Sequence, residues 1–402
     1  MYIPSRFLFD VISSEQLGIF CESNSYGEKS IIAKLPSNTL KALALGAKSE
    51  VLVFISRNYP KYIALVLKVH DSESPMFAVM PQRWHDNLFN KINSDFFNED
   101  ISFVLYDETD APVQFGKIKI KTNFRNKKSL FFIDNKDIES ANDYSNVNKF
   151  LDAIFNALGE KEYETHGFSL QEFKFNIEIS ELQSLLTIHA NEIGVTDYNL
   201  VDDIDGDRQE KQAFQALSLM NDSTCYLSPN VTIGKQTREL TDILCVTKSS
   251  DLIAIESKCL QVDRDKFDKT YERLASRLVK HCKKAIGQLQ GGYKALKRGE
   301  EVTNESGELI PIIEDFSFHG VVLIDEFKYS PSWDEVFNLV ENVKSELGIS
   351  INVIPISEFI YTMKLYNSDI ESFSKSLELR FDICIENKSF DVKFINSALP
   401  EI

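Results

Sequence analysis

The sequence predicts an α/β fold built from two domains and a connector. Its 402 residues exceed the roughly 100 to 200 residues of one ordinary core, so we expect more than one domain. Residues 1–140 contain short runs of β-branched and aromatic residues, which favour a β-rich (α+β) N-terminal domain. Residues 207–402 alternate strand-like and helix-like stretches, which predicts a mixed sheet flanked by helices. Residues 141–206 are interpreted as the connector.

Composition excludes several classes of protein. Hydrophobic residues make up 43% and charged residues 26% of the chain, as in globular rather than disordered proteins. No apolar stretch approaches the roughly 20 residues that span a membrane, and the first residues lack a signal-like apolar region, so we expect a cytoplasmic protein without membrane contact. The six cysteines show no pair at zinc or redox spacing. Because the net charge is −17, any nucleic-acid site has to be local.

The N-terminal elements are predicted from short apolar runs bounded by Asn, Asp, Ser, Gly or Pro. The expected strands cover residues 51–55, 62–69, 77–80, 101–106, 115–120 and 130–133. In the connector, residues 147–158 have helical spacing, and apolar residues alternate over 173–179. Seven acidic residues between positions 192 and 210 then predict a solvated linker that leads into a helix.

The C-terminal elements follow a regular alternation. We expect a helix over 208–220, three strands over 226–233, 240–246 and 252–257, and a long amphipathic helix over 266–298. A strand over 321–324, a helix after Ser332, a strand over 351–356 and a short helix over 358–365 complete the domain. The second and third strands, joined by a turn at 249–251, predict a β-hairpin.

Charged residues stand at the open end of this hairpin. Asp242 begins its first strand and Glu256 ends its second, so the two carboxylates can converge, as magnesium requires of its oxygen ligands. Lys258 leaves the same face of the strand as Glu256. A metal and a lysine together could activate water and stabilise a phosphate under attack. An ordinary exposed ion pair is the alternative, although the apolar neighbours of Glu256 indicate an interior strand.

These residues resemble the PD-(D/E)XK nuclease superfamily, in which an acidic helix, a strand with Asp, a strand ending in Glu-x-Lys and a further helix follow in this order. The resemblance covers residues 207–298. It implies a restriction-endonuclease-like fold, with magnesium, or manganese in its place, as cofactor. The implied metal ligands are Asp242, Glu256 and the carbonyl of Ser257, and Lys258 is the implied catalytic lysine. Thr241 replaces the proline that often precedes the Asp.

The resemblance also implies two accessory catalytic residues. Glu210, on the preceding helix, would be an additional acid, although an acid in a first helical turn also favours the helix dipole. Many members carry a glutamine that faces the site from the helix after Glu-x-Lys. Gln288 or Gln290 could supply it.

The long helix contains the only strongly basic segment. Residues 264–298 carry eleven basic and three acidic side chains, whereas the whole chain is acidic. A solvated helix face is the ordinary interpretation, and contact with nucleic-acid phosphates is the alternative that the hairpin favours. The residues expected to bind nucleic acid are Lys280, Lys283, Lys284 and Lys294.

The sequence therefore predicts a metal-dependent DNA endonuclease, with RNA left open as a substrate. A nuclease with an additional N-terminal domain is similar to prokaryotic restriction and anti-phage defence effectors, the Shedu type among them, and this analogy implies a homo-oligomer whose N-terminal domain senses, recruits or assembles. The alternative function is a nucleic-acid-binding or assembly protein that keeps the nuclease-like fold without turnover.

Overall fold

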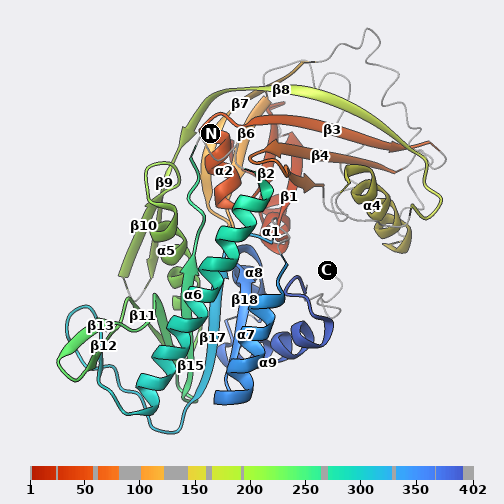
Figure 1. Cartoon of the computed structure of the whole chain (residues 1–402). Coiled ribbons are helices and arrows are strands. Elements are labelled where there is room, and N and C mark those ends of the chain that lie inside the picture. Colours follow the sequence, from red (N-terminus) through yellow and green to blue (C-terminus); the bar gives the residue numbers. More distant parts are fainter. Residues whose placement is uncertain are drawn as a thin grey trace. The chain divides into compact units, whose positions relative to one another are not determined.

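The chain divides into two compact units, Met1–Leu185 and Leu186–Ile402 (Figure 1). The structure is a computed structural model, and it describes residues 2–23, 26–57, 62–80, 101–121, 144–159, 165–191, 194–263, 270–327, 332–366 and 368–392. The boundary falls inside the predicted connector, so residues 141–206 are shared between the two units. Within the described ranges, no helix combines the length and the apolar character that crossing a bilayer requires.

The first unit is built on one eight-stranded sheet with the strand order β1-β2-β6-β7-β8-β3-β4-β5. Its strands are β1 (Gly18–Ser23), β2 (Lys29–Lys34), β3 (Lys48–Ser56), β4 (Ile63–His70), β5 (Met76–Val79), β6 (Ile101–Tyr106), β7 (Pro112–Lys121) and β8 (Leu170–Ser184). Its helices are α1 (Arg6–Ser14), α2 (Ser37–Ala44) and α4 (Tyr144–Leu158). Phe150 of α4 packs on Tyr62 and Phe168, with ring centroids 5.5 Å away, which attaches the helix to one face of the sheet.

Most N-terminal predictions agree with this unit, with two differences. Strands β3 to β7 coincide with the predicted runs, while the predicted strand 130–133 lies outside the described residues. The predictions missed α1, α2, β1 and β2 because these elements are short and their burial depends on distant strands. The alternating residues 173–179 belong to the long strand β8, which pairs with both β3 and β7, so this stretch of the connector is an interior strand of the sheet.

The second unit is centred on a five-stranded mixed sheet with the order β11-β14-β15-β17-β18. Its strands are β11 (Ser223–Leu227), β14 (Ile243–Thr247), β15 (Asp251–Lys258), β17 (Ser317–Ile324) and β18 (Ser350–Pro355). Strands β11, β14 and β15 run antiparallel, whereas β15, β17 and β18 run parallel to one another. The predicted mixed α/β architecture is therefore present.

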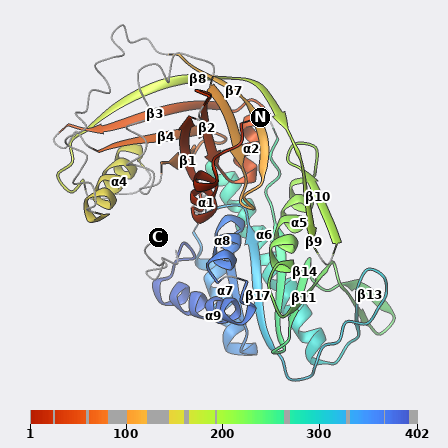
Figure 2. The same cartoon turned by 180° about the vertical axis from the view of Figure 1, so that it is seen from behind.

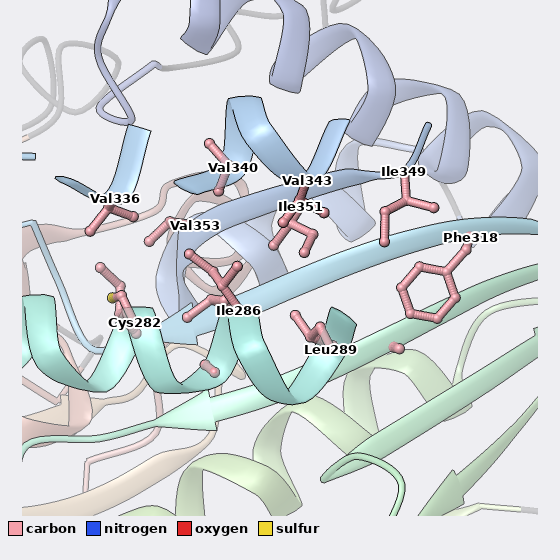
Figure 3. Packing of buried hydrophobic residues seen from close by; sticks show 14 of the residues in the cluster. Cys282, Ile286, Leu289, Phe318, Val336, Val340, Val343, Ile349, Ile351 and Val353 are labelled. Atoms are coloured by element: carbon pink, nitrogen blue, oxygen red, sulfur yellow. The ribbon is translucent and has the colours of Figure 1, made fainter. Parts of the chain in front are cut away.

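Helices cover both faces of this sheet. They are α5 (Asp205–Ser218), α6 (Tyr271–Lys297), α7 (Asp334–Leu347), α8 (Ile356–Leu365) and α9 (Ile370–Asn387). Figure 1 shows α6 crossing one face of the sheet, and Figure 2, the view of the chain from behind, shows α5. Between α6, α7 and the sheet, Cys282, Ile286 and Leu289 meet Val340 and Ile351 in a continuous apolar cluster (Figure 3). A second cluster fills the opposite face beneath α5, α8 and α9.

Two small sheets lie outside the central one and correct two predictions. Strands β9 (Leu186–Asn191) and β10 (Gly194–Asn199) form a hairpin, and β10 occupies part of the stretch 192–210 that was predicted as a solvated linker. Tyr198 stacks on His189 and Thr196 bonds to Gln215, whereas Asp197 points to solvent, so the acidic residue lies on the outer side of a strand.

The predicted strand 226–233 is two strands, β11 and β12 (Asn230–Ile233). The break lies at Ser228, whose φ is 45°, and at Pro229, which has no N–H to continue the ladder. Strand β12 pairs with β13 (Gln236–Glu239) and β16 (Val302–Thr303) in a three-stranded sheet.

Candidate active site

The β14–β15 hairpin brings the two predicted metal-binding carboxylates to one end of the sheet. The last registered pair is Ile243 with Ile255, so Asp242 and Glu256 fall opposite each other one residue further on. The Thr241 hydroxyl donates a 2.6 Å hydrogen bond to the carbonyl of Ile255. This bond spans the open end of the hairpin and helps to hold its register, a role that needs a side-chain hydroxyl.

The site residues project from the sheet face that α6 covers. Leu244 and Ala254 belong to the apolar cluster beneath α6 and α7. Side chains alternate along a strand, so residues two positions apart share a face. Asp242 lies two residues before Leu244, and Glu256 lies two residues after Ala254. Both therefore emerge on the face that α6 covers, as does Lys258 two residues after Glu256.

Lys258 lies between the two carboxylates. Its Nζ donates to Glu256 Oε2 at 2.8 Å and to Asp242 Oδ2 at 3.2 Å. The Glu256 side chain is 1% exposed and that of Lys258 is 16% exposed, so both charges are largely removed from water. Burial opposes the charged form of Lys258, but Asp242 and Glu256 outweigh it and raise the lysine pKa. The lysine therefore remains a cation beside both acids.

Backbone hydrogen bonds hold the chain just after this lysine. Asp205, in the first turn of α5, accepts the N–H of Val262 at 2.7 Å, and Asp325, after β17, accepts the N–H of Leu260 at 2.9 Å. Asp205 is itself buried and paired with Arg208 at 2.6 Å. These contacts attach the end of β15 to α5 and β17, which fixes where Lys258 leaves the backbone.

Ser257 contributes main-chain groups to the same end of the hairpin. Its N–H donates to Asp242 Oδ2 at 2.6 Å, so this edge of β15 faces the aspartate. The N–H and C=O of one strand residue point to the same side, which directs the Ser257 carbonyl toward the Asp242 side of β15. The Ser257 hydroxyl oxygen is buried without a hydrogen-bond partner among the described residues.

Glu210 of α5 adds a third acid to the site. Burial, followed by the charge of Asp242, raises the pKa of Glu210 to about 8. Burial and Asp242 likewise raise the pKa of Glu256 to about 7, although Lys258 opposes the shift. The shared dependence on Asp242 shows that α5 and the hairpin bring these acids together. Both acids are therefore partly or largely protonated near neutral pH, and the negative charge of the site increases as the pH rises.

Asp242 and Glu256 are ligands of the type that magnesium prefers, although they do not form a complete protein cage around an ion. The described residues contain no group of three or more His, Cys, Asp or Glu side chains in an arrangement that would hold a metal. Magnesium, however, usually takes only one or two carboxylates, together with waters and substrate phosphates. Asp242 and Glu256 supply that number, and a divalent cation beside them would favour their ionised forms. The residues present therefore fit the implied cofactor.

Helical geometry distinguishes the two candidate glutamines on α6. His281, Gln288 and Gly292 share one face of the helix because they are separated by seven and four residues. Burial, then Arg277 and then Lys258 lower the pKa of His281, so His281 lies near Lys258. A Cβ at Gly292 would lie 3.3 Å from the Leu240 carbonyl, so Gly292 lies close to the chain just before the hairpin. Gln288 thus lies on the side of α6 that faces the hairpin end, and its Oε1 is buried without a partner among the described residues.

Gln290 falls two residues later, on the opposite side of α6, so the structure does not bring it to the site. His281, which lies on the same face of α6 as Gln288, was not singled out by sequence analysis. Its helical phase relative to Gln288 was the available signal.

The four lysines predicted to contact nucleic acid are all exposed on α6. Lys283 is bonded to Glu335 of α7 at 2.6 Å, so its charge already has a partner. Lys280, Lys284 and Lys294 form no hydrogen bond or ion pair with any part of the chain that the structure describes. The four residues therefore differ in their availability to an external anion.

Comparisons with family models, with curated proteins and with solved structures found no match for this chain.

The buried charge of Glu210 leads to a prediction about stability. Its folded-state pKa of about 8 exceeds the usual carboxyl value, so from about pH 4.5 to pH 8 the folded state binds more protons than the unfolded state. Stability should therefore fall as the pH rises through this window. Glu210→Gln removes the buried charge, and in EDTA it should raise the melting temperature at pH 8 but not at pH 4. A melting-temperature difference independent of pH, measured by thermal unfolding, would contradict the burial of this charge.

Proposed function

We propose that this protein is a magnesium-dependent endonuclease that hydrolyses DNA phosphodiester bonds with a restriction-endonuclease-like C-terminal unit. The observation that carries the proposal is the Lys258 ammonium held between Asp242 and Glu256 at the end of a buried hairpin. Paired acids beside a lysine suit phosphodiester hydrolysis, because the reaction adds negative charge to a phosphate that is already anionic.

The order of elements supports this fold. Helix α5 is followed by three antiparallel strands of the central sheet, then by α6 and by the parallel strand β17. That is the order expected of an acidic helix, an Asp strand, a Glu-x-Lys strand and a following helix. Glu210 lies on α5, Asp242 immediately before β14 and Glu256 on β15, which is consistent with this proposal.

Each residue has a distinct role in this proposal. Asp242, Glu256 and the Ser257 carbonyl hold the metal, which when bound would lower the pKa of a coordinated water and offset charge on the phosphate. Lys258 orients the attacking water and neutralises charge that develops on the phosphate oxygens. Burial keeps this ammonium in place, because both of its carboxylate contacts are shielded from water.

Glu210 and Gln288 would act as accessory groups. Glu210, with its raised pKa, can hold a proton near neutral pH and exchange it with water beside Asp242. The unpartnered Gln288 amide oxygen can accept a hydrogen bond from a water or a substrate group.

Incubation with supercoiled plasmid tests the activity. Wild-type protein with magnesium, or with manganese in its place, should convert the plasmid to relaxed or linear forms, and protein in EDTA should not. Glu256→Gln is the matched inactive control, because the amide keeps the size of the side chain and an acceptor for Lys258 but removes the metal-binding charge. Cleavage by Glu256→Gln at the wild-type rate would exclude this site as its source.

A binding or assembly function without turnover is the second candidate. It is favoured by the same ion pairs, because Lys258 already satisfies both carboxylates and no complete metal cluster occurs among the described side chains. This candidate predicts DNA binding without loss of supercoiled plasmid under any metal condition.

The resemblance suggests a biological setting. We propose a prokaryotic anti-phage defence role in which a cytoplasmic homo-oligomer acts on invading DNA. The N-terminal unit would recognise a signal of infection or assemble the oligomer. Loss of protection against phage in cells that carry Glu256→Gln, compared with wild type, tests this setting directly.

A further inference from the structure

A row of basic residues follows one face of α6 with a strict alternation of four-residue and three-residue steps. Such steps keep side chains on a single face over many turns. The row, called the basic stripe below, consists of Arg273, Arg277, Lys280, Lys284, Gly287, Gly291 and Lys294. It contains no acidic residue, and it spans about 32 Å at the usual rise of an α-helix.

The stripe carries the charges on α6 that are available to an external anion. Its five basic side chains form no hydrogen bond or ion pair with the residues the structure describes, and Arg273, Lys280, Lys284 and Lys294 are exposed. Two lysines outside the stripe are already engaged within the protein. Lys283 pairs with Glu335, and Lys297 lies 4.1 Å from the centre of the Phe316 ring. The available positive charge is thus concentrated on one face.

Two glycines interrupt the charges near the middle of the stripe. Gly287 has open space where a Cβ would be, and Gly291 would meet only a side-chain nitrogen of Arg238 at an ordinary 3.6 Å. Neither glycine has the positive φ that would require the absence of a side chain. Glycine weakens a helix interior relative to alanine. No packing contact among the described residues and no backbone conformation explains Gly287, whereas the Arg238 side chain lies against Gly291. An external molecule that approaches the helix backbone at Gly287 would explain the absence of a side chain there.

Arg238 extends the positive charge beyond α6. It belongs to the β12–β13 hairpin, where β13 is exposed along its length, and its guanidinium lies over Gly291. The glycine pair is therefore a low point on the helix surface, with Lys284 before it, Lys294 after it and Arg238 beside it. Gln288, which faces the hairpin end of the active site, is the residue immediately after Gly287.

We propose that the basic stripe is the docking surface for the phosphate backbone of duplex DNA, which approaches the α6 backbone most closely at Gly287. The proposal rests on the nuclease function and names the surface that delivers substrate to its site. Charge complementarity identifies a polyanion, and the length of the stripe matches about nine base pairs of duplex. Single-strand sites usually add aromatic side chains on which bases stack, and the stripe has none.

Binding measured without cleavage tests the charges. Fluorescence anisotropy of a labelled 30-base-pair duplex in EDTA should show at least tenfold weaker binding for the double variant Lys280→Gln with Lys284→Gln. The slope of log affinity against log salt concentration should decrease in magnitude by about two, one for each lost phosphate contact. The matched control, Lys283→Gln with Lys297→Gln, removes the same charge from other faces of the same helix and should change affinity less than twofold. Equal losses in both double variants would overturn the proposal.

The glycine pair has a separate test. Gly287→Leu should leave the melting temperature unchanged or higher, because leucine favours the helix and finds open space there, yet it should weaken duplex binding at least fivefold. Unchanged affinity would refute close approach at this position.

Three further ligands decide the class of nucleic acid. Single-stranded DNA, duplex RNA and heparin are titrated in the same way, and duplex DNA should bind most tightly and show the largest loss in the stripe variant. A stronger response with any of the other three would overturn the assignment to duplex DNA. Because the assay contains no metal, stripe-dependent binding combined with an intact plasmid would refute only the nuclease function. Plasmid cleavage with unchanged binding by the stripe variants would refute only the docking surface.

Discussion

Asp242→Asn and Glu256→Gln should each reduce plasmid cleavage by about a thousandfold or more, because each removes a charge that would hold the metal at the scissile phosphate. Amides are preferable to alanine at both positions. Asp242 accepts the buried N–H of Ser257 as well as Lys258, so Asp242→Ala would leave a buried donor unpaired and destabilise the hairpin by about 1 to 3 kcal/mol.

The matched control for these two variants is Asp251→Asn, which lies at the opposite end of the same hairpin. It loses the same charge from the same strand pair and should cleave at close to the wild-type rate. Thermal unfolding and duplex binding in EDTA should be similar for all three variants, which separates lost chemistry from lost folding. A wild-type cleavage rate for either Asp242→Asn or Glu256→Gln would show that the metal site is assigned incorrectly.

Lys258→Ala should slow cleavage by about a hundredfold or more while retaining magnesium binding. Lys258 is a competing cation between the two carboxylates, so its removal leaves more negative charge for the metal, and magnesium affinity should be equal or higher. Calorimetry of magnesium binding alongside single-turnover cleavage measures the two effects separately. Lys258→Arg should restore part of the rate at most, because the planar guanidinium cannot occupy the same position as an ammonium.

Lys248→Ala provides the control for this lysine. Lys248 follows β14 in the same hairpin, is 78% exposed and pairs with Asp222 on the surface, so its loss should leave cleavage unchanged. If Lys258→Ala loses magnesium binding, the lysine acts by organising the ligands and the proposed division of roles is wrong.

Local patterns were sufficient to predict the hairpin and the neighbouring positions of its charged residues. Asp242, Glu256 and Lys258 are separated by spacings that a β-hairpin and a strand convert directly into neighbours, because register and alternation are properties of a few consecutive residues. The long helix was predicted for the same reason, since its apolar residues repeat at helical spacing over many turns. These parts of the candidate site need no information from the rest of the chain.

Other features depend on which distant segments meet. Strand β10 was interpreted as part of an acidic linker, because the burial of Tyr198 against His189 cannot be seen in a local count of charges. The interior position of β8 likewise requires two partners, β3 and β7, that are far apart in sequence.

The tertiary arrangement also changed how the charged residues are understood. Lys283 and Lys284 are equivalent in the sequence pattern of the helix. In the structure Lys283 pairs with Glu335 of α7, whereas Lys284 is available to an external anion, because helix packing brings Glu335 to only one of them. Glu210 and Asp242 are 32 positions apart, yet burial beside each other raises the pKa of Glu210 to about 8. Short-range spacing thus accounts for the identity of the site residues. Their protonation, neutralisation and access depend on contacts across the fold, because electrostatic energy follows distance and burial rather than position in the sequence.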